Sequence, residues 1–246
     1  FRVLPALFFE NLLQQAFLAA EDADFFEHHG LDLKAVLRAT ARNIRAGGVV
    51  QGASTITQQV ARNMFLTSER RLARKIKEAI LAWRIEKHFT KQDILGLYLN
   101  HIYLGQGAYG VQAAALTYFG RPVDQLNLLE SAVLAGLPKA PSAYSPSQHP
   151  ERALKRAGYV LTRLTDTGAI TKEEAKAAAS LPLRLDKKRG AQRGAFFLEH
   201  VRRTLEKSYG SDALYRGGLE VRTTLDPKLQ AAAEEAVQAG LIKLKD

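Results

Sequence analysis

Hydrophobic positions recur at helical spacing along most of the chain. Apolar residues three or four positions apart predict helices over 10–21, 32–46, 54–65, 69–89, 91–104, 110–120, 126–137, 151–165 and 171–179. The segment 126–137 is apolar almost all round, which predicts a helix in the centre of the core. Residues 138–150, rich in Pro and Ser, are expected to form a loop, and Gly168 a turn. The pattern predicts a mainly α fold.

The long segment 69–89 separates apolar from charged residues. The stripe that we expect to face inward consists of Leu72, Ile76, Ile80 and Trp83. The other side carries the charged residues Arg70, Arg74, Lys77 and Glu78. Two interpretations stay open from this helix alone. The charges could form ordinary ion pairs on an exposed helix, or a cationic surface for a phosphate with an embedded acid.

The composition changes at residues 186–194, a basic, Gly-containing stretch that we interpret as a linker. We therefore divide the chain into a domain over 1–185 and a tail over 186–246. Within the tail, the pattern predicts a helix over 196–208, a strand over 219–225 and a last helix with Asp226 as N-cap and Pro227 in the first turn. We interpret this tail as the α/β start of a second domain.

The charge balance favours an anionic partner. The chain has 246 residues, with 35 Lys and Arg against 25 Asp and Glu, which gives a formal net charge of +10. The partner classes are nucleic acid, an anionic membrane surface or a phosphate-bearing substrate. The absence of cysteine from the sequence excludes disulfides, thiolate metal sites and cysteine nucleophiles. No apolar run reaches the ~18 residues of a spanning helix, so we expect any anchor to lie upstream of Phe1.

The stretch "EDADFFEHHG", residues 21–30, gathers ionisable groups and could be a metal site, a catalytic carboxylate or helix-end chemistry. Adjacent histidines point about 100° apart on a helix, which is a poor arrangement for one metal ion. We therefore expect one histidine to bond a backbone group. The acids that we expect to be solvated are Asp22, Asp24 and Glu27, and for Asp22 a second expectation is that it holds Glu21 or the adjacent turn.

Glu21 differs from those acids because it follows the apolar run "AFLAA" directly. We expect its carboxylate at the edge of the core, where partial burial raises the pKa towards the range useful for proton transfer. A second polar group opens the helix near residue 56. Thr55 and Gln58 fit a capping box, and a helix N-terminus attracts anions. Capping does not by itself explain the two consecutive glutamines, Gln58 and Gln59.

Five segments in order, "EDADFFEHHG", "GASTITQQ", "RKIKE", "ILGLYLN" and "GAYGVQAAALTYFG", resemble the peptidoglycan glycosyltransferases of glycosyltransferase family 51. These form the transglycosylase domain of class A penicillin-binding proteins, and the resemblance covers roughly residues 5–180. The tail segment "YRGGLEVRTTLDPKLQ" is similar to the link into the transpeptidase domain of bifunctional members. Neither S-x-x-K nor K-T-G occurs, so that second catalytic domain is absent from this chain.

The resemblance implies a lysozyme-like, bilobed fold with a membrane-associated jaw, and a reaction that polymerises lipid II into β-1,4-linked glycan. The reaction inverts the anomeric carbon and releases undecaprenyl pyrophosphate. Glu21 matches the family's proposed general base. Glu78 matches the glutamate thought to assist departure of pyrophosphate, directly or through a bound divalent cation. No cofactor is implied as obligatory, and Mg²⁺ or Mn²⁺ at Glu78 is the one metal option.

The resemblance also implies a substrate cleft, lined by Arg38, Ser54, Gln58, Gln59 and Arg62. The cations expected to neutralise the leaving pyrophosphate are Arg70, Arg74 and Lys77. The implied partners are lipid II, the nascent glycan strand, the membrane surface, phosphoglycolipid inhibitors of the moenomycin type and other cell-wall synthesis proteins, without nucleic acid. The implied location is the extracytoplasmic, periplasmic face of the bacterial inner membrane, with an upstream transmembrane anchor.

Two rival interpretations remain. A lysozyme-like glycan hydrolase would also use two carboxylates, with water as the nucleophile, but has little use for the cationic helix face. A basic module that binds nucleic acid would need aromatic residues on a basic surface, and we expect the aromatics here to be interior. Gly96 and Gln112 stand where family members commonly carry Glu, which puts local salt bridges in doubt.

Overall fold

The computed structural model describes residues 11–45, 54–66, 71–186, 195–216 and 221–243. Up to residue 185 the elements in chain order are α1 (Asn11–Glu21), α2 (Leu33–Arg45), α3 (Ile56–Phe65), α4 (Arg71–His88), α5 (Lys91–His101), α6 (Val111–Phe119), the short 3₁₀ helix η2 (Val123–Gln125), α7 (Leu128–Gly136), α8 (Pro150–Asp166) and α9 (Lys172–Ala179). Among the described residues the only β-type pairing is an isolated bridge between Tyr103 and Tyr109. The mainly α prediction is confirmed.

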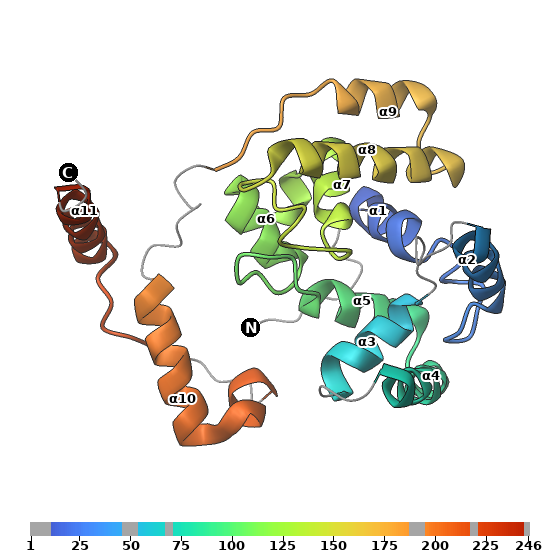
Figure 1. Cartoon of the computed structure of the whole chain (residues 1–246), viewed down its shortest axis with the longest axis horizontal. Coiled ribbons are helices and arrows are strands. Elements are labelled where there is room, and N and C mark those ends of the chain that lie inside the picture. Colours follow the sequence, from blue (N-terminus) through green and yellow to red (C-terminus); the bar gives the residue numbers. More distant parts are fainter. Residues whose placement is uncertain (1–10, 46–53, 67–70, 187–194, 217–220, 244–246) are drawn as a thin grey trace. The chain divides into compact units, whose positions relative to one another are not determined.

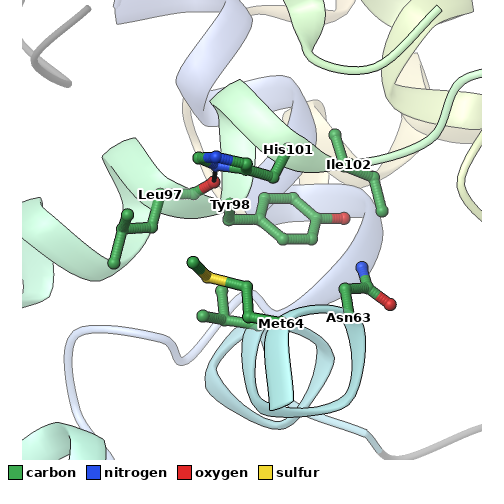
Figure 2. A pocket seen from close by; sticks show the side chains of 7 residues that line it. Asn63, Met64, Leu97, Tyr98, His101 and Ile102 are labelled. Atoms are coloured by element: carbon green, nitrogen blue, oxygen red, sulfur yellow. Dashed lines mark hydrogen bonds between the residues drawn. The ribbon is translucent and has the colours of Figure 1, made fainter. Parts of the chain in front are cut away.

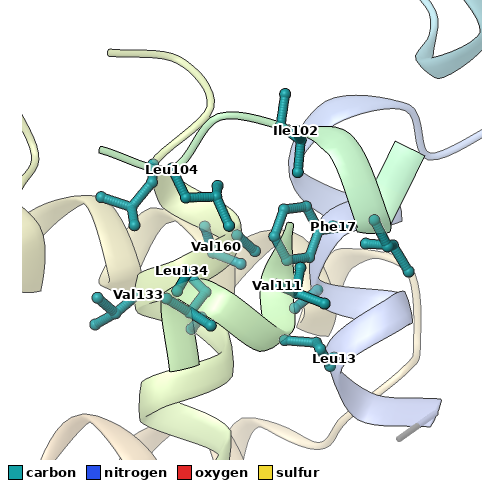
Figure 3. Packing of buried hydrophobic residues seen from close by; sticks show 14 of the residues in the cluster. Leu13, Phe17, Ile102, Leu104, Val111, Val133, Leu134 and Val160 are labelled. Carbon is teal, nitrogen blue, oxygen red and sulfur yellow. The ribbon is translucent and has the colours of Figure 1, made fainter. Parts of the chain in front are cut away.

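The core forms where α1 and α8 pack on α7 (Figure 1). Residues 129–136 of α7 are all buried, as the all-round apolar pattern predicts. Figure 3 shows Leu13 and Phe17 of α1 and Val160 of α8 gathered around Val133 and Leu134 of α7. Packing of this kind stabilises helices that would be marginal alone, and it fixes the C-terminal end of α1, where Glu21 lies.

A second group of helices surrounds α3, which packs against both α4 and α5. On α4 the expected inward stripe is wrong. Ile76, Ile80 and Trp83 are 63%, 52% and 49% exposed, whereas Glu78 is fully buried. The second half of this helix is apolar nearly all round, so periodicity could not identify the buried face. The side chain of Leu72 lies outside the described set.

Gly30 explains why the opposite face of α4 turns inward. This glycine has φ +88°, and a Cβ there would lie 3.0 Å from the backbone carbonyl carbon and oxygen of Ala82. The loop before α2 therefore passes directly over the α4 backbone at Ala82. This close approach requires glycine at position 30. The face with Glu78 and Ala82 packs inward, and the large apolar side chains point outward.

The expectation of interior aromatics holds for Phe17, Phe25, Tyr98, Tyr118 and Phe119, which are buried, but is wrong for others. Phe26, Phe65 and Tyr109 are more than half exposed, and Trp83 is 49% exposed. These exposed rings therefore no longer count against a nucleic-acid partner. The residues that depart from the family pattern are accommodated locally. Gly96 is buried within α5, and Gln112 Oε1 accepts a hydrogen bond from the Val123 backbone at 3.1 Å.

Residues from Asp186 onward form a separate compact unit. Its helices are α10 (Ala195–Arg216), with non-helical backbone at Gly210, and α11 (Pro227–Lys243). Asp226 Oδ1 accepts hydrogen bonds from the backbones of Lys228 and Leu229, so the predicted N-cap is confirmed. Residues 221–225 do not form the predicted strand, because no partner strand is present among the described residues to complete a ladder. No helix in the described ranges is long and apolar enough to cross a membrane.

Candidate active site

The stretch 22–30 docks onto the first turn of α3. Asp22 Oδ2 accepts a hydrogen bond from the Ile56 backbone at 2.8 Å, and His28 Nε2 lies 3.0 Å from both Asp22 oxygens. Thr55 Oγ1 donates to the Gly30 carbonyl at 2.7 Å. Asp22 is therefore buried, so the expectation that it is solvated is wrong, while its expected role in holding the adjacent turn is confirmed. The partner of Asp22 lies 34 residues away, where local sequence cannot reveal it.

The other ionisable groups in this stretch behave more simply. His28 Nδ1 accepts a hydrogen bond from the Gly30 backbone, which confirms that a histidine satisfies a backbone group. Glu27 is exposed, and Asp24 pairs with Arg38 at 2.9 Å. Within the described ranges, no three His, Cys, Asp or Glu side chains gather where they could hold a metal ion.

The capping box at the start of α3 is confirmed. Gln58 N donates to Thr55 Oγ1 at 3.1 Å, and Thr55 N donates to Gln58 Oε1 at 3.0 Å. The side-chain oxygen of Gln58 therefore has a structural role. Gln59 has a different one, because its Nε2 donates to Glu21 Oε2 at 3.0 Å. The two consecutive glutamines serve separate purposes, one in the helix and one at the carboxylate.

Glu21 ends α1 with one carboxylate oxygen engaged and the other free of hydrogen bonds to described residues. Its side chain is 13% exposed, and Oε1 lies 4.0 Å from Arg156 Nη2. Burial raises the pKa of Glu21, as its position beside the core predicts. The Gln59 hydrogen bond and the positive charges of Arg156 and Arg62 act in the opposite direction. The result is a buried carboxylate with an available oxygen, which is the geometry of a general base.

Glu78 is fully buried on α4 and is joined to Ser54 through a lysine. Lys75 Nζ donates to Glu78 Oε2 and to Ser54 Oγ, both at 2.7 Å. Arg74 Nε lies 3.4 Å from Glu78 Oε1, without the geometry of a hydrogen bond. The predicted embedded acid among cations is present, but sequence analysis missed Lys75. Its position three residues before Glu78, on the same helix face, is the signal that could have found it.

The remaining predicted residues are distributed less compactly. Arg38 is exposed and pairs with Asp24 and Asp32, at 2.9 and 3.6 Å, rather than with either glutamate. Lys77 is exposed on α4. Arg62 lies on α3, and its charge lowers the pKa of Glu21. Arg70 lies outside the described residues.

The start of α3 is thus the common support of both carboxylates. Gln59 holds Glu21, and Ser54 accepts a hydrogen bond from the lysine that binds Glu78. Glu21 has an available carboxylate oxygen, whereas Glu78 lies beside the two cations Arg74 and Lys75. Such an arrangement can remove a proton from one group and stabilise an anion leaving from another.

Tyr98 of α5 lies close to Glu21 and was not found from sequence. Figure 2 shows its ring between α5 and α3, where it lines a narrow gap with Asn63, Met64, Leu97, His101 and Ile102. Its buried hydroxyl has no hydrogen-bond partner among the described residues. Burial, and next the charge of Glu21, raise the pKa of Tyr98 well above its ordinary value. The phenol therefore stays neutral beside the carboxylate.

Comparison with known proteins places this geometry in context. A family model described as "Transglycosylase" matches residues 5–165. Penicillin-binding protein 1A of Aquifex aeolicus is 50% identical over 226 residues, covering 92% of this chain and 31% of that protein. Penicillin-binding protein 1A of Escherichia coli is 46% identical over 230 residues, covering 93% of this chain and 27% of that protein.

A solved structure, that of Penicillin-Binding Protein 1A from Haemophilus influenzae, is 36% identical with a TM-score of 0.44. The match covers 74% of this chain and 24% of that chain. The chain spans about a third or less of the length of these relatives.

Proposed function

Because this chain belongs to the transglycosylase family, we propose that it polymerises lipid II into β-1,4-linked glycan strands with release of undecaprenyl pyrophosphate. The observation that carries the proposal is the pair of buried carboxylates, Glu21 and Glu78, supported by one helix start. One carboxylate has an available oxygen and the other holds two cations. Polymerisation requires these two functions, since a hydroxyl must lose a proton while a pyrophosphate departs.

Glu21 acts as the general base in this proposal. The 4-hydroxyl of the incoming lipid II gives its proton to Glu21 Oε1 as it attacks the anomeric carbon of the growing chain. Gln59 fixes the other oxygen, so the carboxylate has one defined orientation. A base must be within hydrogen-bond reach of the proton that it removes, and its pKa works best near the operating pH. Burial moves the pKa of Glu21 in that direction.

The leaving pyrophosphate is stabilised by the cations of α4. Lys75 is half exposed although its hydrogen-bond partner Glu78 is fully buried, so the ammonium group can also reach a phosphate oxygen. Arg74 is the second cation at this end. Glu78 serves to hold both cations in place, and preorganised positive charge stabilises negative charge that develops in the transition state.

The residues around Glu78 do not fit a divalent cation. Mg²⁺ requires near-octahedral oxygen ligands, whereas the described neighbours of this carboxylate are the side chains of Arg74 and Lys75. Two cationic groups at the carboxylate would repel the ion. The proposed mechanism therefore has no step through a metal.

The cationic end of the site also favours the transferase over a glycan hydrolase. An inverting hydrolase would use Glu21 to activate water, but its leaving group is a sugar hydroxyl that needs a proton rather than positive charge. The Lys75 and Arg74 pair at Glu78 has no function in that reaction. Both the charge arrangement and the family support the transferase.

A membrane surface is the proposed location of the substrate. Exposed apolar side chains lie on α2 and α4, namely Leu33, Leu37, Ile76, Ile80 and Trp83. Lys87 Nζ lies 3.5 Å from the centre of the Trp83 ring, a pairing suited to the border between lipid and anionic headgroups. We place the domain at the extracytoplasmic face of the inner membrane, with an upstream anchor, where lipid II, the glycan strand, moenomycin-type inhibitors and other cell-wall proteins would meet it.

The test is polymerisation of labelled lipid II in detergent by the wild type and Glu21→Gln. The wild type is expected to make glycan chains, and the variant to lose at least 100-fold in rate, since general acid–base catalysis contributes roughly 10²–10⁴-fold. Glu27→Gln is the matched control, because Glu27 lies in the same stretch but is exposed. Undiminished activity of Glu21→Gln would refute the assignment of the base, and a wild type that cleaves glycan instead would favour the hydrolase.

A further inference from the structure

Arg156 of α8 is a buried cation held rigidly across from Glu21. Its side chain is 9% exposed, and its Nε donates to the Gly136 carbonyl at 3.4 Å. The guanidinium carbon lies 4.4 Å from the Tyr159 ring centre and 5.9 Å from that of Tyr144. Stacking of this kind and a carbonyl bond fix both the position and the orientation of the planar group.

The backbone of α7 is shaped to admit this arginine. A Cβ at position 136 would lie 2.8 Å from Arg156 Cγ, so the stem of the arginine occupies the space that any larger residue would need. Gly136 has ordinary helical backbone within α7, and its small size matters here for packing alone. Arg156 is therefore built into the interface between α7 and α8 rather than placed on a surface.

Of the cations that the structure describes, Arg156 alone comes within 4.0 Å of the Glu21 carboxylate. That separation is too long for a hydrogen bond but short enough for a strong charge interaction at a mostly buried pair. The guanidinium can thus favour the ionised carboxylate while leaving Oε1 able to accept a proton from substrate.

The geometry points to Arg156 as a positioning residue that keeps Glu21 in the ionised form that a general base requires. Its catalytic consequence rests on the proposed function, but its effect on the carboxylate does not. Without a compensating charge, a carboxylate buried to this extent would bind a proton too tightly to act as a base.

The other groups that face Glu21 have different roles. From α3, Gln59 donates a hydrogen bond that lowers the pKa of Glu21, and the charge of Arg62 lowers it less than that of Arg156 does. Asp22, directly after α1, raises the pKa of Glu21, and the buried Tyr98 of α5 is neutral. Arg156 supplies the largest charge effect that lowers the pKa of Glu21.

The test measures the pKa of Glu21 directly in the whole 246-residue chain. Carbon-13 labelled glutamate carboxylates are titrated by NMR, with the Glu21 signal assigned by its loss in Glu21→Gln. Arg156→Met removes the charge but keeps the length of the stem, and is expected to raise the pKa of Glu21 by about one pH unit. Arg156→Lys keeps the charge and should shift it less.

Arg163→Met is the matched control. Arg163 also lies on α8 and also donates its Nε to a carbonyl at 3.4 Å, that of Ala19, but its charge pairs with Asp166. The pKa of Glu21 is expected to stay at the wild-type value in this variant. In lipid II assays, only Arg156→Met should move the acid limb of the kcat/KM profile to higher pH, by about one pH unit and hence roughly 10-fold in rate on that limb.

An unchanged Glu21 pKa in folded Arg156→Met, or an equal shift in Arg163→Met, would overturn the inference. If Arg156→Met does not fold by circular dichroism, Arg156→Gln decides. That variant also removes the charge but keeps an N–H group for the Gly136 carbonyl, and the pKa of Glu21 must then rise. A wild-type protein that does not polymerise lipid II would refute the proposed function. The NMR titration of Glu21 would still decide the role of Arg156.

Discussion

Glu78 combines complete burial with few partners. Among the described residues, Lys75 donates the one hydrogen bond that Glu78 receives from a side chain, and Glu78 Oε1 has no hydrogen bond at all. A buried carboxylate with an unsatisfied oxygen is costly, because the protein replaces little of the hydration that the group loses. Such a group persists where its charge has a use, here the placement of two cations.

We predict that Lys75→Met lowers both stability and activity. The substitution leaves Glu78 with Arg74 as its remaining ion-pair partner, so the free energy of unfolding should fall by about 1–3 kcal/mol. Adding Glu78→Gln should recover part of that stability without restoring lipid II polymerisation. Urea denaturation and the glycan assay measure the two effects. A double variant less stable than Lys75→Met would contradict this account.

At the residue scale, sequence could identify the glutamates but not all of their partners. Glu21 was predictable because an apolar run precedes it, and Glu78 because cations flank it. Arg156 and Tyr98 reach Glu21 from helices far along the chain, so no local pattern predicts them. The burial of Asp22 was not predictable for the same reason, since its bond to the backbone of Ile56 joins residues 34 positions apart.

At the element scale, α3 depends on a cap that also ties it to another segment. Thr55 and Thr90 form the same capping box with the third residue of α3 and of α5. Thr55 is buried and additionally donates to the Gly30 carbonyl, whereas the Thr90 cap is exposed. The two threonines therefore form a natural matched pair.

We predict that Thr90→Val costs about 1 kcal/mol of unfolding free energy, the usual value of an N-cap. Thr55→Val should cost about 2 kcal/mol, because the buried Gly30 carbonyl also loses its donor. It should reduce lipid II polymerisation as well, since residues 54–59 support both carboxylates. Equal losses in urea unfolding would mean that the link between Thr55 and Gly30 contributes nothing.

For helix α4, the hydrophobic pattern predicts the extent of the helix but not its buried face. Its extent was predicted closely, because helical periodicity over so long a segment is a strong signal. The choice of its buried face was wrong, because a helix with apolar residues on both sides offers two candidates. The close approach of Gly30 to Ala82 decides between them, and only the folded chain contains that contact.

At the scale of the whole molecule, the site opposes stability at neutral pH. Burial raises the pKa of Glu21 above its ordinary 4.5, so the folded protein holds this proton more tightly than the unfolded chain. Stability therefore falls as the pH rises from 4.5 through the raised pKa, by about 1.4 kcal/mol for each pH unit of difference.

We accordingly predict that Glu21→Gln is more stable than the wild type at pH 7, although it is inactive. Below pH 4.5 the two proteins should differ little, because the carboxyl is then protonated in both states. Thermal unfolding at several pH values measures the difference, with the exposed Glu27→Gln as control. A wild type that is the more stable protein at pH 7 would contradict the prediction.

The helices were largely predictable, including the two in the tail, and the tail strand was not. Every predicted helix up to residue 179 has a counterpart, because amphipathic periodicity and caps such as Thr55 are local properties. The predicted strand at 219–225 does not form in its described part, because a strand depends on a partner that local sequence does not contain.

Residues 54–59 have several roles at once, which has a consequence for resistance to inhibitors. Thr55 and Gln58 cap helix α3, and Ser54 accepts a hydrogen bond from Lys75, which also binds Glu78. Gln59 donates a hydrogen bond that orients Glu21. An inhibitor that bound these residues would be hard to evade by mutation, because a substitution that weakened its binding would also disturb folding or catalysis. Variants resistant to such an inhibitor should therefore carry substitutions elsewhere, at surface positions that contribute to neither folding nor catalysis.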